Sequence, residues 1–259
     1  MPVIAQVSTD APEPATKDPQ GIAVVQQAIS AMAGTTLAQG NLDSVSTGTL
    51  LIGGSSPAAF PITIKTKGTR KVRSELERPN GKGVRILNDG RAAIVRADGK
   101  IRRLSRVNTV AERVTHIPLL SLLAEFQDAD VEVKADAATM SDARPVAVVT
   151  LSLVAVDKND PVENPREVTL TTFLIDASTG FVAEVRYTSH AENNPLDKRP
   201  VVIRYSDYRQ VSGIWVPFRQ TTYLDGKLES ELVLGSVSFG VGLSDSEFEL
   251  PEPEVANAQ

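Results

Sequence analysis

Hydrophobic and polar residues alternate along most of this 259-residue chain, and such alternation is typical of strands that bury one face. The early segments 45–52 and 60–67 follow the pattern. Three turn dipeptides, Asn80-Gly81, Asp89-Gly90 and Asp98-Gly99, then recur at a spacing of nine residues. Both residues of each dipeptide tolerate the positive φ that a two-residue hairpin needs. The spacing predicts a meander of antiparallel strands about seven residues long.

The second half of the chain continues the strand pattern. Asp225-Gly226 supplies another hairpin turn, and Leu228, Leu232 and Leu234 follow it at alternating positions. Because successive side chains of a strand point to opposite faces, we expect these three leucines to share one buried face. The strands predicted in this half are 131–134, 145–156, 166–176, 181–188, 201–208, 214–218 and 227–234.

One early segment has helical spacing instead. Asp18 suits the N-cap of a helix, and Pro19 suits its first turn, where no backbone N–H is needed. Apolar residues then recur every three or four positions, and Gly34 is well placed to end the helix. The pattern predicts an amphipathic helix over residues 19–33.

A second apolar segment, 109–126, interrupts the strand pattern in the middle of the chain. Its leucines are too many for a single helix face, and Pro118 suits the start of a helical turn. The simplest interpretation is a helix that fills the core. Its apolar residues include Leu119, Leu120, Leu122, Leu123 and Phe126.

Length and composition fit a single large domain. Hydrophobic residues make up 41% and charged residues 23% of the chain, as in ordinary globular proteins. We expect a flexible N-terminal segment over residues 1–18, one domain over 19–251, and a flexible tail over 252–259. The chain has no cysteine, which excludes disulfides, a thiolate nucleophile and a zinc–sulfur site.

Positive charge is concentrated between Lys65 and Arg106, where fourteen Lys and Arg face only four acids, while the whole chain carries a net charge of −5. No aromatic residue occurs from Pro61 to Glu125, so bases would find no stacking partner, and nucleic-acid binding is not expected. The simplest interpretation is a solvated strand face. The alternative is a patch for anionic lipid headgroups or an acidic protein surface. Its candidate residues are Lys65, Lys67, Lys71 and Arg73.

The sequence offers little that could perform catalysis. His116 lies in the apolar segment, where a buried or capping role is expected, and His190 lies near Glu192 without a third metal ligand. A Gly-rich phosphate loop, a nucleophile elbow and a zinc-protease motif are all missing. We therefore expect no enzyme, no metal site and no cofactor.

The C-terminal motifs point to a family. Tyr-x-Asp-Tyr-Arg, Gly-Ile-x-x-Pro-Phe, the Asp-Gly hairpin and a closing Phe-Glu-Leu-Pro lie within residues 205–251. This set of motifs resembles the C-terminal end of the outer-membrane lipoprotein-sorting proteins, which are relatives of the periplasmic lipoprotein carriers of the LolA/LolB type. The residues that carry the resemblance are Tyr205, Asp207, Tyr208, Arg209, Gly213, Ile214, Pro217, Phe218, Phe248, Glu249 and Pro251.

The resemblance implies an α+β fold, in which a curved antiparallel sheet forms an incomplete β-barrel and helices cover its concave side. It also implies that the segment 109–126 acts as a movable lid over an apolar cavity. Strand residues at alternating positions would supply the opposite wall of that cavity. The resulting cavity candidates are Leu119, Leu120, Leu123, Phe126, Ile62, Ile64, Val72 and Leu76.

The function implied by the resemblance is non-enzymatic binding or carriage of lipid or lipoprotein acyl chains in the bacterial periplasm. The expected partners are a lipid or a lipidated protein, with envelope proteins and a peripheral membrane contact as further partners. The alternative is a scaffold of the cell envelope with a permanently filled interior. Val3-Ile4-Ala5-Gln6 has the small residues of a signal cleavage site but lacks the basic and hydrophobic parts, so we expect a signal that is absent or truncated here, or an arbitrary start.

Overall fold

One antiparallel sheet dominates the computed structural model, which describes residues 14–34, 42–53, 56–105, 108–109, 112–154, 164–191 and 194–252. The first six strands are β1 (Ser44–Ile52), β2 (Ala58–Lys67), β3 (Lys71–Arg78), β4 (Gly81–Asn88), β5 (Arg91–Val95) and β6 (Ile101–Arg103). The others are β7 (Val131–Ser141), β8 (Arg144–Leu153), β9 (Thr171–Asp176), β10 (Val182–Ala191), β11 (Asn194–Val211), β12 (Ile214–Leu224) and β13 (Lys227–Phe239). The helices are α1 (Pro19–Ala33), α3 (Pro118–Gln127), α4 (Pro165–Val168) and the 3-10 helix η2 (Asp245–Phe248).

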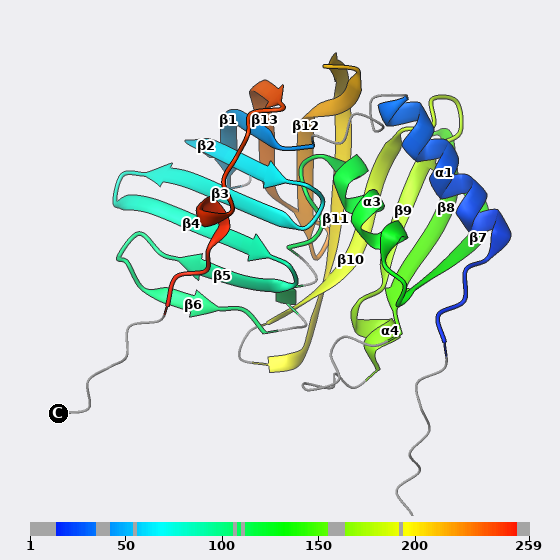
Figure 1. Ribbon diagram of the computed structural model, residues 1–259, viewed down its shortest axis with the longest axis horizontal. Helices are drawn as coiled ribbons and strands as arrows, with labels where there is room; N and C mark the ends of the chain where they lie inside the picture. Colours follow the sequence, from blue (N-terminus) through cyan, green and yellow to red (C-terminus); the bar gives the residue numbers. More distant parts are fainter. Residues whose placement is uncertain are drawn as a thin grey trace, which may run out of the picture.

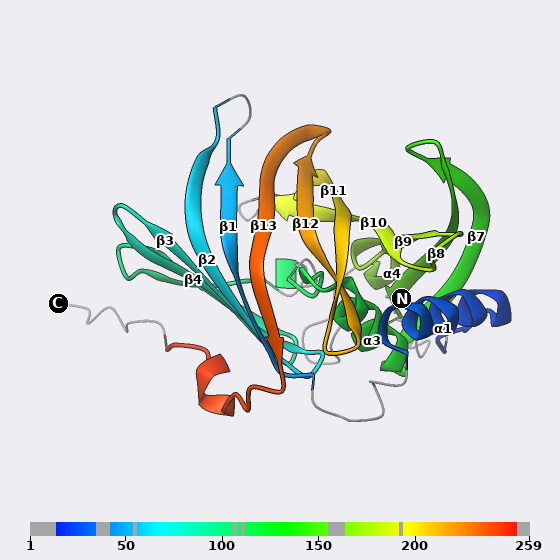
Figure 2. The same cartoon turned by 90° about the horizontal axis from the view of Figure 1, so that it is seen from above.

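The sheet consists of two meanders that meet in its middle. The strand order is β6-β5-β4-β3-β2-β1-β13-β12-β11-β10-β9-β8-β7, so β1 pairs with β13 and joins the two halves. Strands β6 and β7 lie at the two edges, and the described residues do not pair them with each other. Figures 1 and 2 show that the sheet arches, with β1, β13 and β12 in the middle and a flank on either side. The predicted fold class, α+β with an incomplete barrel, is confirmed.

The first helix forms as predicted. The side chain of Asp18 accepts hydrogen bonds from the backbone N–H groups of Gln20 and Gly21, Pro19 opens the helix, and Gly34 ends it. Helix α1 packs against β7, β8, β12 and α3, so it closes one side of the arch together with α3 (Figure 1). Gly21 approaches the backbone of β7 so closely that a Cβ there would lie 3.0 Å from the nitrogen of Ala135.

The three predicted hairpin turns of the first meander are also confirmed. Asn80-Gly81 joins β3 to β4, Asp89-Gly90 joins β4 to β5, and Asp98-Gly99 precedes β6. Asp89 has a φ of 45° and Gly90 a φ of 81°, as a two-residue hairpin turn requires.

Several predicted boundaries were wrong. The segment 166–176 begins with the short helix α4, which Pro165 opens, and β9 starts only at Thr171. The helix in the second apolar segment is shorter than predicted, because it starts at Pro118 after turns and bends over 112–117. Strand β11 starts at Asn194, seven residues before the predicted start at 201.

The leucines of β13 do not all share one face. Leu232 and Leu234 are buried, whereas Leu228 is 44% exposed. The pairing of β12 with β13 shifts between Thr222 and Tyr223, which marks a bulge. A bulge changes the side-chain alternation, so Leu228 turns away from the face that Leu232 occupies.

The ends of the predicted domain lie against the sheet. The backbone N–H of Val133 in β7 donates to the carbonyl of Thr16, and Asp18 N–H donates to the carbonyl of Val133. At the other end, η2 contacts β3 and β4. Of the predicted flexible segments 1–18 and 252–259, residues 1–13 and 253–259 lie outside the described residues, whereas Thr16 and Asp18 are hydrogen-bonded to β7.

Candidate functional site

Burial decreases along the concave face of the arch from one end to the other. In β1, the inward side chains of Ser44 and Ser46 are buried, whereas Leu50 and Ile52 are half-buried. In β2, burial likewise falls from Ile64 towards the start of the strand. We call the well-packed part, around Ser46, Ile64, Phe218 and Val237, the closed end. The half-buried part, around Leu50, Phe60, Leu76, Tyr187 and Leu224, is the open end.

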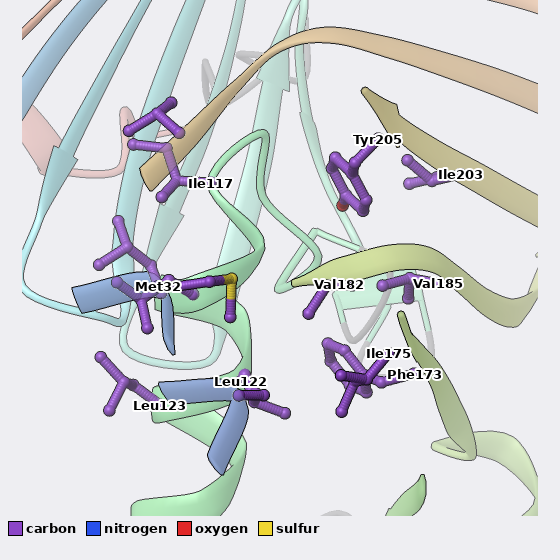
Figure 3. Packing of buried hydrophobic residues seen from close by; sticks show 14 of the residues in the cluster. Met32, Ile117, Leu122, Leu123, Phe173, Ile175, Val182, Val185, Ile203 and Tyr205 are labelled. Atoms are coloured by element: carbon purple, nitrogen blue, oxygen red, sulfur yellow. The ribbon is translucent and has the colours of Figure 1, made fainter. Parts of the chain in front are cut away.

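Helices α1 and α3 fill the closed end. Leu119, Leu120 and Leu123 belong to the same buried cluster as Ile62 and Ile64. Phe126, Val72 and Leu76 lie half-buried against that cluster. Figure 3 shows Met32 of α1 and Leu122 and Leu123 of α3 gathered beside the side chains of β9, β10 and β11. The eight predicted cavity residues therefore meet, and most of them form the core of the closed end.

A buried polar network ties the segment 112–117 to the sheet. Nε2 of His116 lies 2.8 Å from Oγ of Ser46 in β1, and the hydroxyl of Tyr205 in β11 donates to the carbonyl of Thr115 at 3.0 Å. The backbone N–H of Thr115 donates to Oγ of Ser121 at the start of α3. Burial lowers the pKa of His116 to about 4, so its imidazole is neutral near pH 7. The expected buried role of His116 fits this placement.

The open end presents apolar side chains from several strands. Leu50 (β1), Leu76 (β3), Tyr187 (β10) and Leu224 (β12) are half-buried and pack against the edge of the core cluster. Phe60 lies on the same face, because it pairs with Leu50 across β1 and β2. The guanidinium of Arg78 lies 5.5 Å from the centre of the Phe60 ring. The open end is therefore an apolar surface with a basic rim.

Gly83 of β4 leaves free space on this surface. It pairs with Leu76 of β3, so a side chain at position 83 would point towards the concave side. A Cβ built at Gly83 would meet no atom of the described residues within 4 Å. The open end therefore has room beside Leu76.

The predicted basic patch lies on the opposite, convex face. Lys65 pairs with Arg73 and Lys67 pairs with Lys71 across β2 and β3, so like charges stand directly opposite each other. Such pairs are destabilising unless acids compensate them.

The C-terminal helix η2 supplies the compensating acids. Glu247 contacts the ammonium group of Lys65, and its carbonyl accepts a hydrogen bond from Arg73. Asp245 lies 3.3 Å from the Lys67 ammonium and 2.7 Å from that of Lys71. The hydrogen bond from Lys71 lowers the pKa of Asp245, and the one from Lys65 lowers that of Glu247. The four predicted cations, which we call the basic stripe, therefore face the chain's own acids.

Phe248 anchors this C-terminal segment. It is completely buried, and η2 contacts β3 and β4. Val84, Ile86 and Ala93 are buried but do not belong to the main core cluster. They pair with convex-face residues, since Ile86 stands opposite Arg73. The segment thus covers a small second core on the outside of the arch, where Figure 1 shows it crossing the sheet.

A separate polar pocket of about 190 Å³ lies beside β10 and β11. The carboxylate of Glu184, which is 2% exposed, lies between Arg186 and Arg204, and Nε of Arg204 donates to it at 2.9 Å. Asp142 and Arg144 also line the pocket. These charges satisfy one another, and the pocket contains none of the predicted site residues.

The described residues hold no group of three or more His, Asp or Glu side chains placed to bind a metal ion. His190 is buried in β10, and its candidate partner Glu192 lies outside the described residues. No helix of the described ranges is long and apolar enough to cross a membrane.

Comparison with known proteins identifies the fold. No protein-family model and no curated protein sequence matches the chain. Among solved structures, an outer membrane lipoprotein-sorting protein domain from Vibrio parahaemolyticus is 11% identical, with a TM-score of 0.57, and the match covers 88% of this chain and 96% of that one.

Two further structures agree with this match, and each covers 88% of this chain. A LolA superfamily protein from Nitrosomonas europaea is 11% identical over 97% of its own length, with a TM-score of 0.55. A DUF1329 family protein from Desulfovibrio piger is 14% identical over 96% of its length, with a TM-score of 0.56. The fold is therefore that of the LolA-like lipoprotein-sorting proteins, as the C-terminal motifs predicted.

Proposed function

We propose that the open end of the concave face binds acyl chains of a lipid or a lipidated protein without covalent chemistry. The observation that carries this proposal is the gradual loss of burial from the closed end to the open end, which leaves apolar side chains of five strands half-buried on the concave face. Burying an acyl chain against such a surface gains roughly 0.8 kcal/mol per CH₂ group. The free space beside Gly83 gives a chain room to enter.

The fold likeness supports the setting of this proposal. A similar solved structure is an outer membrane lipoprotein-sorting domain, and this likeness supports our proposal that the protein acts in the bacterial periplasm with lipid or lipidated protein as its partner. Under this proposal, residues 19–251 act as one carrier domain, and α3 fills the closed end.

A charge placed at the open end is expected to abolish uptake of an apolar probe. Leu50→Asp combined with Leu224→Asp puts two carboxylates on the binding surface, and both positions are half-buried, so the closed end stays intact. Titration of a fluorescent fatty-acid probe measures the effect, with an expected loss of affinity of at least about tenfold. Leu228→Asp, on the exposed opposite face, is the matched control and keeps the affinity of the original protein.

A scaffold with a permanently filled interior is the second candidate function. The complete burial of Leu119 and Leu122 in the core favours it. Under the scaffold hypothesis the original protein takes up no probe, and the two aspartates change nothing in the titration. Saturable uptake that the aspartates abolish contradicts the scaffold.

We also propose that the basic stripe binds anionic lipid headgroups when the acids of η2 are removed. Asp245→Asn with Glu247→Gln leaves the lysines without their intramolecular partners, so binding to acidic vesicles is expected to increase. The increase should vanish at high salt, because exposed charges are screened beyond about 8 Å at physiological ionic strength. Cosedimentation with vesicles at two salt concentrations measures it. If the double variant bound acidic vesicles no better than the original protein, the headgroup proposal would be wrong, and the stripe would be a solvated strand face.

A further inference from the structure

The flank formed by β4, β5 and β6 carries arginines on the same face as the apolar binding surface. Arg85 pairs with Ser74 of β3, which lies between the core-facing residues Val72 and Leu76. Because residues two apart in a strand share a face, Arg85 also points to the concave side. Arg102 of β6 lies on the same face, because Arg85 and Arg102 both pair with Ile94 of β5.

Arg85 contacts the segment that connects β6 to α3. Its Nη1 donates to Oε1 of Glu112 at 3.3 Å, and its side chain is still 61% exposed. Burial raises the pKa of the Tyr187 hydroxyl, Glu112 raises it further, and Arg85 lowers it. The hydrogen bond places the Arg85 guanidinium beside Glu112, while most of its surface stays open to solvent.

Arg78 forms the basic rim of the open end. Its guanidinium lies over the Phe60 ring, and no carboxylate of the described residues forms an ion pair with it. Leu76 and the free space at Gly83 lie between Arg78 and Arg85 along the hairpin of β3 and β4. An apolar surface with room for a chain is thus flanked by two exposed guanidinium groups, those of Arg78 and Arg85.

We infer that the ligand of the open end is an amphiphile with an anionic group, and that Arg85 binds this group with support from Arg78. This inference rests on the proposed function and specifies its ligand. A guanidinium can donate two parallel hydrogen bonds to a carboxylate or a phosphate, which a neutral glycerol headgroup cannot accept with the same strength. Within the described ranges, the long contact to Glu112 leaves most donors of Arg85 available.

The test uses three probes with the same acyl chain: a fatty acid, a lysophosphatidylglycerol and a neutral monoacylglycerol. The original protein is expected to bind one or both anionic probes about ten- to a hundredfold more tightly than the neutral probe, as charge-assisted hydrogen bonds predict. Preference for the fatty acid alone identifies a carboxylate ligand, and preference for the lysophospholipid alone identifies a phosphate headgroup. Arg85→Gln should remove the preference and leave the affinity for the neutral probe unchanged.

Arg91→Gln is the matched control, because Arg91 pairs with Asn88 on the convex face of the same flank. It should leave all three affinities unchanged. Equal affinity of the original protein for the three probes, unaltered by Arg85→Gln, would overturn the anionic ligand while the proposed acyl-chain site stands. If none of the probes binds to the original protein, the proposed function fails and this inference fails with it.

Gly83→Phe gives a second readout that does not depend on charge. The backbone of Gly83 does not require positive φ, and the added ring enters free space, so folding should be retained. The ring fills the room beside Leu76 and should lower the affinity for all three probes to a similar extent. Uptake that persists in Gly83→Phe with the original affinities would place the ligand elsewhere and overturn the assignment to Arg85.

Discussion

Phe248→Ala is expected to lower the free energy of unfolding by about 3–5 kcal/mol, the range for removing a fully buried aromatic ring. Phe248 has no exposed surface, and it belongs to the C-terminal segment that covers the second core on the convex face. Its loss also weakens the hold of Asp245 and Glu247 on the basic stripe, because the ring anchors the helix that carries both acids. Chemical denaturation at pH 7 measures the change.

Val241→Ala is the matched control for this experiment. Val241 precedes η2 in the same segment but is 41% exposed, so its truncation should change the free energy of unfolding by less than about 0.5 kcal/mol. A loss below about 1 kcal/mol for Phe248→Ala would mean that the segment detaches at little cost. The second core of Val84, Ile86 and Ala93 would then be stable without its cover.

The sequence predicts the local elements of this fold well. The Asp18 cap, the Pro19 start and the Gly34 end act over a few residues, so they locate α1 without knowledge of the rest of the chain. Turn dipeptides are equally local, because positive φ at Asp89 and Gly90 follows from the residues themselves.

Features that depend on partners far along the chain were missed. The bulge at Thr222 that exposes Leu228 arises from the pairing of β12 with β13, and strand alternation alone does not reveal it. The ion pairs of the basic stripe join Lys65 and Lys71 to acids more than 170 residues later in the chain. The C-terminal acids do carry a signal, since Asp245 and Glu247 come just before the aromatic Phe248 in an otherwise polar segment, but the sequence gives no indication of the strands on which they dock.

The predicted cavity residues and the proposed open end overlap only in part. The leucine-rich segment and the alternating residues of β2 and β3 lie in or against one buried cluster, and Leu119, Leu120 and Leu123 lie in the closed end. The open end depends on Leu50, Tyr187 and Leu224, whose half-burial follows from what packs against each strand in the folded chain and cannot be read from alternation alone. Arg85 was counted only as part of a basic region, because its inward direction follows from the register of β4 with β3.

Acid is expected to destabilise the protein through His116. Burial holds the pKa of this histidine at about 4 in the folded protein, whereas the unfolded chain titrates near 6.5. Between these values the unfolded state binds a proton that the folded state does not. The histidine therefore does not change the free energy of unfolding above pH 6.5, and it lowers this free energy by about 3 kcal/mol as the pH falls to 4. Denaturation curves at a series of pH values measure this slope.

His116→Gln isolates the contribution of the histidine from those of other titrating groups. The amide of glutamine can keep a hydrogen bond to Oγ of Ser46 but does not titrate, so the variant lacks this part of the slope. Burial raises the pKa of Glu125, which opposes the histidine, and ion pairs lower the pKa of Asp245, but both groups remain in the variant and cancel in the difference. The stability advantage of the original protein over His116→Gln should therefore shrink by about 3 kcal/mol between pH 7 and pH 4. Parallel curves for the two proteins would show that water reaches His116 in the folded state, and that the segment 112–117 is held less tightly than its hydrogen bonds to β1 and β11 imply.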